Sequence, residues 1–528
     1  IFIHGRIDAT HFTVRNAAGL LPADLGAADQ NWNVFRAYTS IENMLYGTEN
    51  IGLNNGLENF NQPSETFTNL VDRNVQMNFA LYADTEDIFP GASLYEIKTS
   101  KTNNLKVYTP YLESEVGKRQ RHLGVWDPQF YHSNSSTNWS RMSIGGYTTV
   151  EGLQLTTSST IGARAIIAIM GSKEIYISSN IAQGFNDSDG AGSVIEVGSG
   201  AARGAKFYIY NNLAYNNSDD QASACFGWYG YFASDKEVFI SNNTAVDCQN
   251  GFQIHNGGGG SSIVHMHNNL ATGSLGSDFL GSNDLTTHAG NISTDATSPD
   301  ISGIANIEFQ NVGNNDYRLS SSALPFVRDN GVDRSSIASF LAKDVLQHSR
   351  GTDGVWDVGF HAAPTQLYRS IGYNNTTSLQ NGSGNNLTIT AGVASFASAV
   401  ADNIGTGDAI QYDRSGDTNI DSIMFIQRRI SSQVFTVTNA DGSSLADMGA
   451  DQDWDIFRAY TSTNSADNTS ENTGIDGVVR NFNITKDLQT NNIQMFYVLY
   501  ADAPFTEAVS SFYKADWPQT PTANINFI

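Results

Sequence analysis

The sequence predicts an all-β protein in which a right-handed parallel β-helix lies between two copies of a small β-rich, sandwich-like module. Three observations predict this architecture. A short strand followed by Asn recurs through the middle of the chain, and one long segment occurs near both ends. The composition, with 48 Gly, 11 Pro and only 16% charged residues, suits strands and tight turns more than helices. At 528 residues, the chain is too long for one ordinary core.

The repeat at the two ends identifies a duplicated module. Residues 32–40 read WNVFRAYTS, and residues 454–462 read WDIFRAYTS. Further segments match in the same order: FTV at 12–14 and 435–437, NFN at 59–61 and 481–483, and LYAD at 81–84 and 499–502. Internal similarity of this kind is the sequence signature of a repeat architecture.

The two copies are unequal in extent. The second has an upstream part, about 366–424, and the first begins at the equivalent of Phe425. Residues 524–528 match 104–108, where the first copy leads into the central domain. We therefore expect a periodic polypeptide of alternating modules and helices; a free-standing protein without its first strands is the alternative. The expected domains are 1–108 (module copy A, truncated at its start), 109–362 (β-helix) and 363–528 (module copy B).

The strand motif of the central domain repeats at the length of one β-helix coil. Its anchoring residues Asn180, Asn212, Asn243, Asn269 and Asn291 are 32, 31, 26 and 22 positions apart. Strands with alternating side chains need apolar residues at inward positions. Asn tolerates the left-handed backbone of a sharp corner, and stacked Asn side chains can bond from coil to coil as a ladder. A β-sandwich with regular Asn turns is the alternative, and it accounts less well for the constant phase.

These coils resemble right-handed parallel β-helix proteins of the pectate-lyase-like type. Residues 121–127 and 149–155 look like the opening of such a helix, and residues 354–360 look like its closing strand. The FRAYTS module resembles modules of very large bacterial surface proteins. The resemblance covers nearly the whole chain and implies the architecture. It implies no single activity, because such helices include lyases, hydrolases, adhesins and phage tailspikes.

Charge and hydropathy exclude two classes of partner. The net charge of -24 makes nucleic-acid binding unfavourable, because phosphate backbones would be repelled. We expect no membrane span, since no apolar run reaches about 18 residues.

Cys225 and Cys248 lack the spacing of a zinc site. They lie about one coil apart, and the sequence leaves open whether they form a disulfide or only stack in the interior.

Paired carboxylates follow two successive Asn corners and suggest a calcium site. They are Asp187 and Asp189 after one coil and Asp219 and Asp220 after the next. Equivalent phase on adjacent coils would place both pairs on one side of the helix, where carboxylate oxygens suit Ca²⁺. Calcium is the only cofactor that the sequence suggests. The alternative is that these are solvated loop residues.

Aromatic and histidine side chains form a second candidate site, for carbohydrate. It consists of Trp228, Tyr229, Tyr231, His255, His265 and His267. Aromatic rings beside glycines can stack on sugars, although packing in the core is their commoner use. His265 and His267 share one strand face and could form a shallow metal or acid–base site. We assign no catalytic residue, and we expect structural roles for Arg36, Arg458, Glu49 and Glu471 because they recur in both modules.

The leading expectation is a structural or adhesive protein of an extracellular or cell-surface fibre. Its expected partners are further copies or a continuation of the polypeptide, end to end, with polysaccharide as a candidate ligand. A polysaccharide lyase or glycoside hydrolase acting on an acidic glycan is the first alternative. A phage tailspike or fibre is the second, although the sequence has no evident coiled-coil segment for a trimer.

Overall fold

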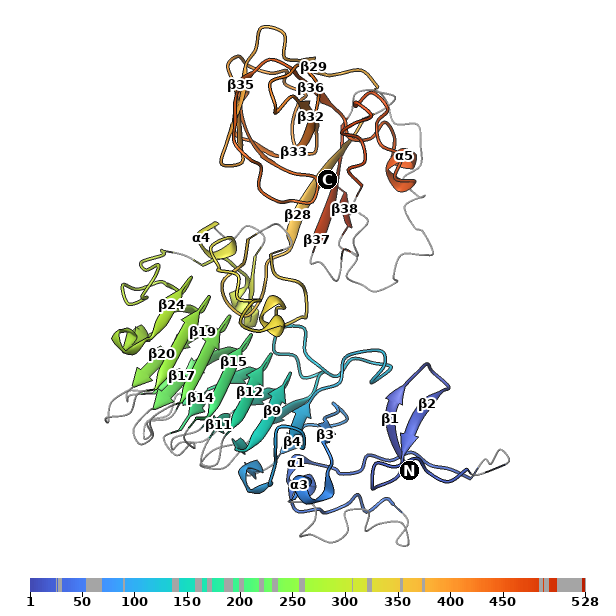
Figure 1. Cartoon of the computed structure of the whole chain (residues 1–528), viewed down its shortest axis with the longest axis vertical. Helices are drawn as coiled ribbons and strands as arrows, with labels where there is room; N and C mark the ends of the chain where they lie inside the picture. The colour runs from blue at the N-terminus through green and yellow to red at the C-terminus, as the bar shows by residue number, and fades with distance from the viewer. Residues whose placement is uncertain are drawn as a thin grey trace. The chain divides into compact units, whose positions relative to one another are not determined.

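The computed structural model divides the chain into two compact units (Figure 1). The first comprises Ile1–Leu346 and Asp357–Ala362, and the second comprises Gln347–Trp356 and Ala363–Ile528. The structure describes residues 1–24, 26, 31–53, 69–88, 91–134, 142–156, 164–168, 173–184, 193–198, 204–217, 223–229, 236–255, 262–305, 307–320, 325–351, 355–372, 376–483, 488, 493–500 and 525–527.

Most of the first unit is a parallel β-helix, in which each coil contributes one strand to each of three sheets, except that the last coil has described strands in two sheets only. The first sheet contains β3 (Met77–Ala80), β6 (Leu105–Tyr108), β9 (Tyr147–Glu151), β12 (Glu174–Ser178), β15 (Lys206–Tyr210), β18 (Glu237–Ser241), β21 (Ile263–His267) and β24 (Thr287–Ala289). The second contains β4 (Asp87–Ile88), β7 (His132–Asn134), β10 (Gln154–Thr156), β13 (Ile181–Gln183), β16 (Leu213–Asn217), β19 (Thr244–Cys248), β22 (Leu270–Thr272) and β25 (Ile292–Ser293). The third contains β5 (Ala92–Ser93), β8 (Met142–Ile144), β11 (Ile166–Ala168), β14 (Ser193–Val197), β17 (Ala224–Tyr229), β20 (Asn250–His255) and β23 (Ser277–Leu280).

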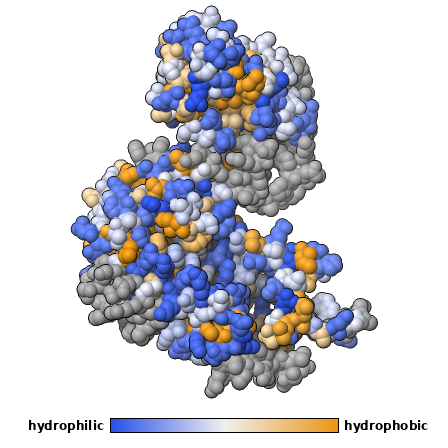
Figure 2. Space-filling model, in the orientation of Figure 1, coloured by the Kyte–Doolittle hydropathy of each residue, from blue (hydrophilic) through white to orange (hydrophobic). Residues whose placement is uncertain are grey.

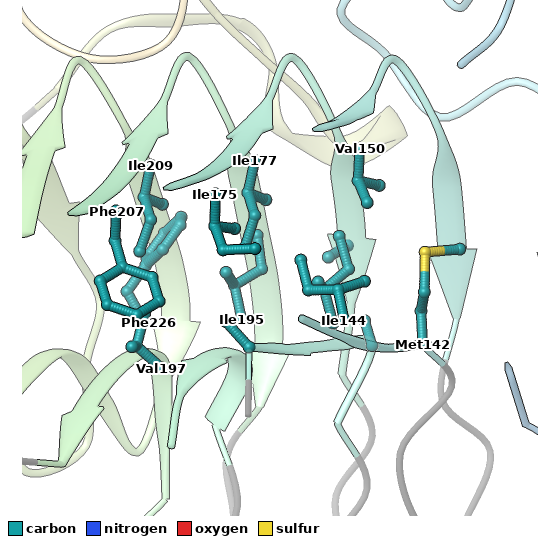
Figure 3. Packing of buried hydrophobic residues seen from close by; sticks show 14 of the residues in the cluster. Met142, Ile144, Val150, Ile175, Ile177, Ile195, Val197, Phe207, Ile209 and Phe226 are labelled. Atoms are coloured by element: carbon teal, nitrogen blue, oxygen red, sulfur yellow. The ribbon is translucent and has the colours of Figure 1, made fainter. Parts of the chain in front are cut away.

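Alternating side chains explain why these strands stack. Ile175 and Ile177 of β12 pair in register with Phe207 and Ile209 of β15, and all four side chains are buried. They point into the interior together with Ile195 of the third sheet (Figure 3). Each fully buried apolar side chain of this size contributes about 1.5–3 kcal/mol. The same register repeated from coil to coil therefore forms one continuous core.

The parallel sheets begin at Met77, within the range that the sequence assigns to module copy A. The expected division at residue 108 falls at the end of β6, where the first sheet already has two strands. Residues before β3 form a hairpin, β1 (Phe2–Arg6) and β2 (Phe12–Arg15), and two short helices, α1 (Ile41–Leu45) and α3 (Leu70–Arg73). After the last coils come the antiparallel pair β26 (Phe309–Asn311) and β27 (Asp316–Leu319) and the helix α4 (Pro325–Arg328).

The second unit contains two sheets. An eight-stranded antiparallel sheet has the order β29-β36-β32-β33-β34-β31-β30-β35. Its strands are β29 (Gln380–Asn381), β30 (Leu387–Thr390), β31 (Val393–Phe396), β32 (Ala409–Tyr412), β33 (Ser422–Arg429), β34 (Val434–Thr438), β35 (Met448–Asp451) and β36 (Trp454–Phe457). A parallel sheet has the order β28 (Thr365–Ile371), β37 (Ile493–Leu499) and β38 (Ile525–Phe527), and the short helix α5 spans Thr463–Asp467.

The chain is therefore all-β apart from short helices, with a parallel β-helix and a flanking antiparallel module, as the sequence predicts. Within the described ranges, none of the helices has the length and apolar character needed to cross a membrane.

Candidate functional site

A ladder of asparagine amides runs along one interior corner of the β-helix. The Nδ2 groups of Asn180, Asn212, Asn243 and Asn269 donate to the Oδ1 atoms of the next Asn at 3.0, 3.0, 3.1 and 2.9 Å, ending at Asn291. Each of these Oδ1 atoms also accepts from the backbone N–H of the preceding ladder residue. All five side chains are buried, so every bond satisfies a group that would be costly to leave unpaired.

The left-handed corner residue is the one before each ladder Asn. Ser179, Asn211, Asn242 and Asn268 have φ of 55–56°. The side chains of Asn211, Asn242 and Asn268 donate to the carbonyls of Lys343, Leu341 and Val332. In each Asn-Asn pair, the first residue therefore turns the corner and holds the segment 332–343, and the second forms the ladder.

The outer face of the first sheet carries a stack of rings. Tyr176, Tyr208, Phe239 and His265 lie on successive strands, with centroids 4.9, 5.0 and 4.6 Å apart and interplanar angles of 9°, 4° and 15°. Phe340 packs edge-on against the first two rings. The ring faces contact one another, so the stack presents mainly edges outward. Offset aromatic contacts of this kind stabilise adjacent coils.

Charged groups lie beside this stack. The Tyr176 hydroxyl donates to Glu174 at 2.5 Å, and Lys206 pairs with Glu237 at 2.6 Å. The hydrogen bond to Glu237 raises the pKa of Lys206. Because opposite charges face each other across strands, this row adds to coil–coil pairing.

His265 and His267 share the outer face, as the sequence predicts from their spacing. The Thr287 hydroxyl lies 2.7 Å from His265 Nδ1 and 3.4 Å from His267 Nε2. Burial lowers the pKa of His267 to about 3, so its imidazole is neutral near pH 7. Among the described residues, no group of three or more His, Cys, Asp or Glu side chains is arranged to hold a metal. The His265 ring stacks on Phe239, and both histidines lie within hydrogen-bond distance of the Thr287 hydroxyl.

The described residues among the other expected carbohydrate ligands lie on the third sheet, apart from His265 and His267 on the first. Trp228 is fully buried, with its ring 6.0 Å from that of Phe207, so it offers no face to a sugar. The Tyr229 hydroxyl bonds to Gln253 at 3.0 Å. His255 ends β20, in register with Tyr229, and lies away from the first sheet that carries His265 and His267. Tyr231 and the calcium candidates Asp187, Asp189, Asp219 and Asp220 lie outside the described residues.

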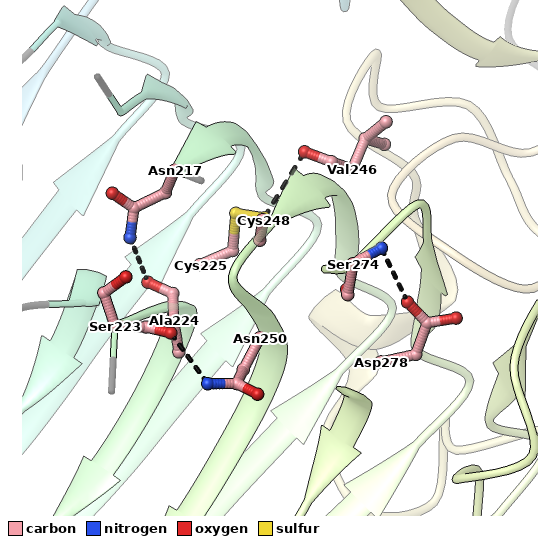
Figure 4. The surroundings of a disulfide bond; sticks show 9 residues. All are labelled: Asn217, Ser223, Ala224, Cys225, Val246, Cys248, Asn250, Ser274 and Asp278. Atoms are coloured by element: carbon pink, nitrogen blue, oxygen red, sulfur yellow. Dashed lines mark hydrogen bonds between the residues drawn. A yellow bond between two sulfur atoms is a disulfide. The ribbon is translucent and has the colours of Figure 1, made fainter. Parts of the chain in front are cut away.

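A disulfide joins Cys225 of β17 to Cys248 of β19, which settles the pairing that the sequence leaves open (Figure 4). The two Cα atoms are 5.9 Å apart, and both side chains are fully buried. The bond connects successive coils across 23 positions of sequence. Closing a loop of this length stabilises a fold by about 3 kcal/mol in the chain-entropy account.

The two module copies keep the same hairpin. In copy A, Phe2 pairs with Arg15 and Arg6 with Phe12; in copy B, Phe425 pairs with Thr438 and Arg429 with Phe435. An offset of 423 relates every partner, and the register shift falls at the same place in both hairpins. Because both hairpins have the same strand register, the repeat in the sequence is also a repeat in the structure.

The FRAYTS segment also repeats its contacts. Asn50 Nδ2 donates to the carbonyl of Arg36, and Asn472 Nδ2 donates to that of Arg458. The guanidinium of Arg36 lies 3.5 Å from the Tyr82 ring centroid, and that of Arg458 lies 3.6 Å from the Tyr500 centroid. Ser40 and Ser462 cap the following helices, α1 and α5. Glu471 accepts from the backbone N–H groups of Asn481, Phe482 and Asn483.

Both copies lead into a parallel strand pair. Met77 of β3 pairs with Leu105 of β6, and Met495 of β37 pairs with Ile525 of β38. These are matching positions of the repeat, which aligns 77 with 495 and 104–108 with 524–528. The second unit therefore contains the same first step of a parallel sheet that opens the β-helix in the first unit.

Comparisons with known proteins give no relative: neither a protein-family model, nor a curated protein, nor a solved structure matches this chain.

Proposed function

We propose that this protein is a structural or adhesive component of an extracellular or cell-surface fibre, built of repeated module plus β-helix units. The observation that carries the proposal is the pair β37·β38, which repeats the register of β3·β6 after a second copy of the module. A polypeptide with this order of elements can extend as a series of helices joined by modules.

The β-helix has features suited to a stiff rod. The Asn ladder, the outer ring stack and the Cys225–Cys248 bond each connect one coil to the next. Disulfides persist mainly in oxidising environments, which supports an extracellular location. The net charge of -24 favours solubility and disfavours binding to nucleic acid.

Immunogold microscopy of the source cells tests this function. Antibodies against residues 1–528 should label surface filaments at regular intervals, and preincubation with the purified chain should abolish the label. Label confined to the cell interior, or to particles without filaments, would contradict the proposal. Turnover of pectin, alginate or another acidic glycan by the purified chain would instead favour the lyase or hydrolase alternative. Binding of such glycans without turnover would fit an adhesive fibre.

A further inference from the structure

Module copy A exposes apolar side chains that copy B buries. Trp32 is 71% exposed, whereas its counterpart Trp454 is 1% exposed; Phe12 is 42% exposed, whereas Phe435 is fully buried. The same contrast holds for Ile3 and Ile426, Val34 and Ile456, and Phe35 and Phe457. Figure 2 shows apolar surface in the region of β1 and β2. Exposed apolar patches of this kind mark interaction sites.

Ile7 shows that the contrast is specific. It is 67% exposed, and its counterpart Ile430 is also 56% exposed. The hairpin is therefore not simply more open in copy A. The five large apolar differences all fall at positions that copy B buries.

In copy B, strands upstream of Phe425 cover these positions. The Phe396 ring of β31 lies 5.6 Å from that of Phe435 and 4.8 Å from that of Trp454. Trp454 Nε1 donates to the Asn385 carbonyl at 2.9 Å. The strand β32 pairs with both β33 and β36. The corresponding residues 32–35 of copy A form no strand, because neither β29 nor β32, the two partners of β36, has a counterpart there.

The outer edge of β3 shows a second difference. In copy B, β28 pairs with β37 on the side away from β38, and the Tyr500 N–H donates to the Ile371 carbonyl at 2.9 Å. In copy A, Met77 and Leu81 donate toward β6, so the alternating N–H groups of Asn78 and Ala80 face the outer edge. The N–H of Tyr82, the counterpart of Tyr500, finds no partner within the described part of the chain.

The backbone on the other side of β28 is also repeated. Tyr460 N–H donates to the Ser370 carbonyl, and Gly372 N–H donates to the Tyr460 carbonyl. Tyr38 occupies the position of Tyr460 in copy A. Its ring packs on Phe79 at 6.2 Å, as that of Tyr460 packs on Tyr497 at 5.9 Å. In copy B, β28 lies between β37 and the backbone of Tyr460. Copy A contains the counterparts of both, β3 and Tyr38.

We infer that copy A has an acceptor face, defined by Ile3, Phe12, Trp32, Val34, Phe35 and the outer edge of β3, and that it binds a second copy of the half-module 365–421. The bound strand corresponding to β28 pairs in parallel with β3, and the strands corresponding to β30–β32 cover the apolar side chains. This inference rests on the proposed repeat of module plus helix, and it names the segment that joins one unit to the next.

The test supplies the half-module in the same polypeptide. A chain is made with an extra copy of residues 363–423 directly before Ile1, which stands at the position of Met424. Trp32 should lose its accessibility to acrylamide, measured as the difference between this chain and its Trp32→Phe variant. Hydrogen exchange should show new protection at the amides of Asn78, Ala80 and Tyr82.

Two variants of the added segment serve as a matched pair. Phe396→Asp removes the ring that contacts Phe435 and Trp454, and it should abolish the protection of Trp32. Thr390→Asp changes an exposed position of β30 and should preserve it. Unchanged accessibility of Trp32 in the extended chain, or equal protection with Phe396→Asp, would overturn the inference. Concentration-dependent protection of Trp32 in the chain without the extension that persists when its own Phe396 is changed to Asp would show a different occupant and would also overturn it.

These outcomes are separable from those of the proposed function. Protection of Trp32 is measured on purified protein and does not depend on filaments at a cell surface. Labelled filaments, together with a Trp32 that stays accessible in the extended chain, would support the proposed fibre and contradict only the acceptor face.

Discussion

Arg458 Nη1 lies 2.8 Å from each carboxylate oxygen of Asp408, and both side chains are fully buried. Its counterpart Arg36 pairs instead with Asp84, and both of these side chains are about half exposed. Asp408 belongs to the upstream part of copy B, which has no counterpart in copy A. One residue of the repeat thus forms a buried ion pair in one copy and a surface pair in the other.

This difference predicts unequal effects of two carboxylate deletions. Asp408→Ala removes the carboxylate that pairs with the buried guanidinium of Arg458 and should lower the free energy of unfolding of the second unit by about 3–5 kcal/mol. Asp84→Ala should cost at most about 1 kcal/mol, because an exposed pair is screened by water. Urea unfolding of both variants measures this. Equal losses would show that burial of the pair does not govern its contribution.

The ladder predicts a large effect for a single amide. Asn212→Ala removes two side-chain donor bonds, to Asn243 and to the Ile177 carbonyl, and two accepted bonds from Asn180. We expect a loss of about 2–4 kcal/mol in the free energy of unfolding, since buried groups lose their partners. Asn78→Ala, at an exposed position of β3, should change it by less than about 0.5 kcal/mol. A loss for Asn212→Ala as small as that for Asn78→Ala would contradict the role of the ladder.

The disulfide predicts a redox-dependent stability. Reduction should lower the free energy of unfolding of the first unit by about 3 kcal/mol, because the unfolded chain regains the entropy of the closed loop. Thermal unfolding with and without dithiothreitol measures the change. The double variant Cys225→Ala and Cys248→Ala is the control, and dithiothreitol should leave it unaffected. If wild type responds no more than this variant, the bond does not form in solution.

Burial of His122 predicts a pH dependence. Its Nε2–H donates to the Ser179 carbonyl and its Nδ1 accepts from the Gly124 N–H, so the neutral ring is fixed between them. Burial, and then the charge of Arg121, lowers the pKa from 6.5 to about 3. Below pH 6.5 the unfolded state binds a proton that the folded state does not, so stability falls with decreasing pH.

The slope of this loss should approach about 1.4 kcal/mol per pH unit between pH 6.5 and 3. His122→Gln keeps an amide donor without a titrating group and should flatten that part of the profile. Urea unfolding at several pH values measures both chains. The same slope in wild type and variant would show that His122 is not responsible.

The sequence was sufficient for the coil repeat and the duplicated module because both depend on patterns at constant spacing. Asn180 and Asn212 occupy the same position in successive coils. Comparing the other positions of the coil in the same way would also have revealed the ring stack. Tyr176, Tyr208, Phe239 and His265 each lie four positions before a ladder Asn. Of these four residues, only His265 was among the predicted site residues.

Residues that lie at no constant distance from the ladder Asn could not be placed in the same way. Loops of varying length separate Trp228 from the anchors, so its inward direction on β17 depends on the third sheet. The pairing of Cys225 with Cys248 depends on contact between strands of different sheets in successive coils. The start of the helix at Met77 was hidden because the module repeat continues through the first strands.

The central claim is that the unit of this protein is one module followed by one β-helix. The most direct test is small-angle X-ray scattering of residues 1–528 followed by a second copy of residues 109–372. If β38 opens a helix as β6 does, the added segment should supply six further strands of the first sheet, from β9 to β24. The longest dimension should then include a new rod of about 29 Å, at about 4.8 Å per strand. An added segment that scatters as an unfolded chain, or a particle that gains mass without a second rod, would contradict the claim.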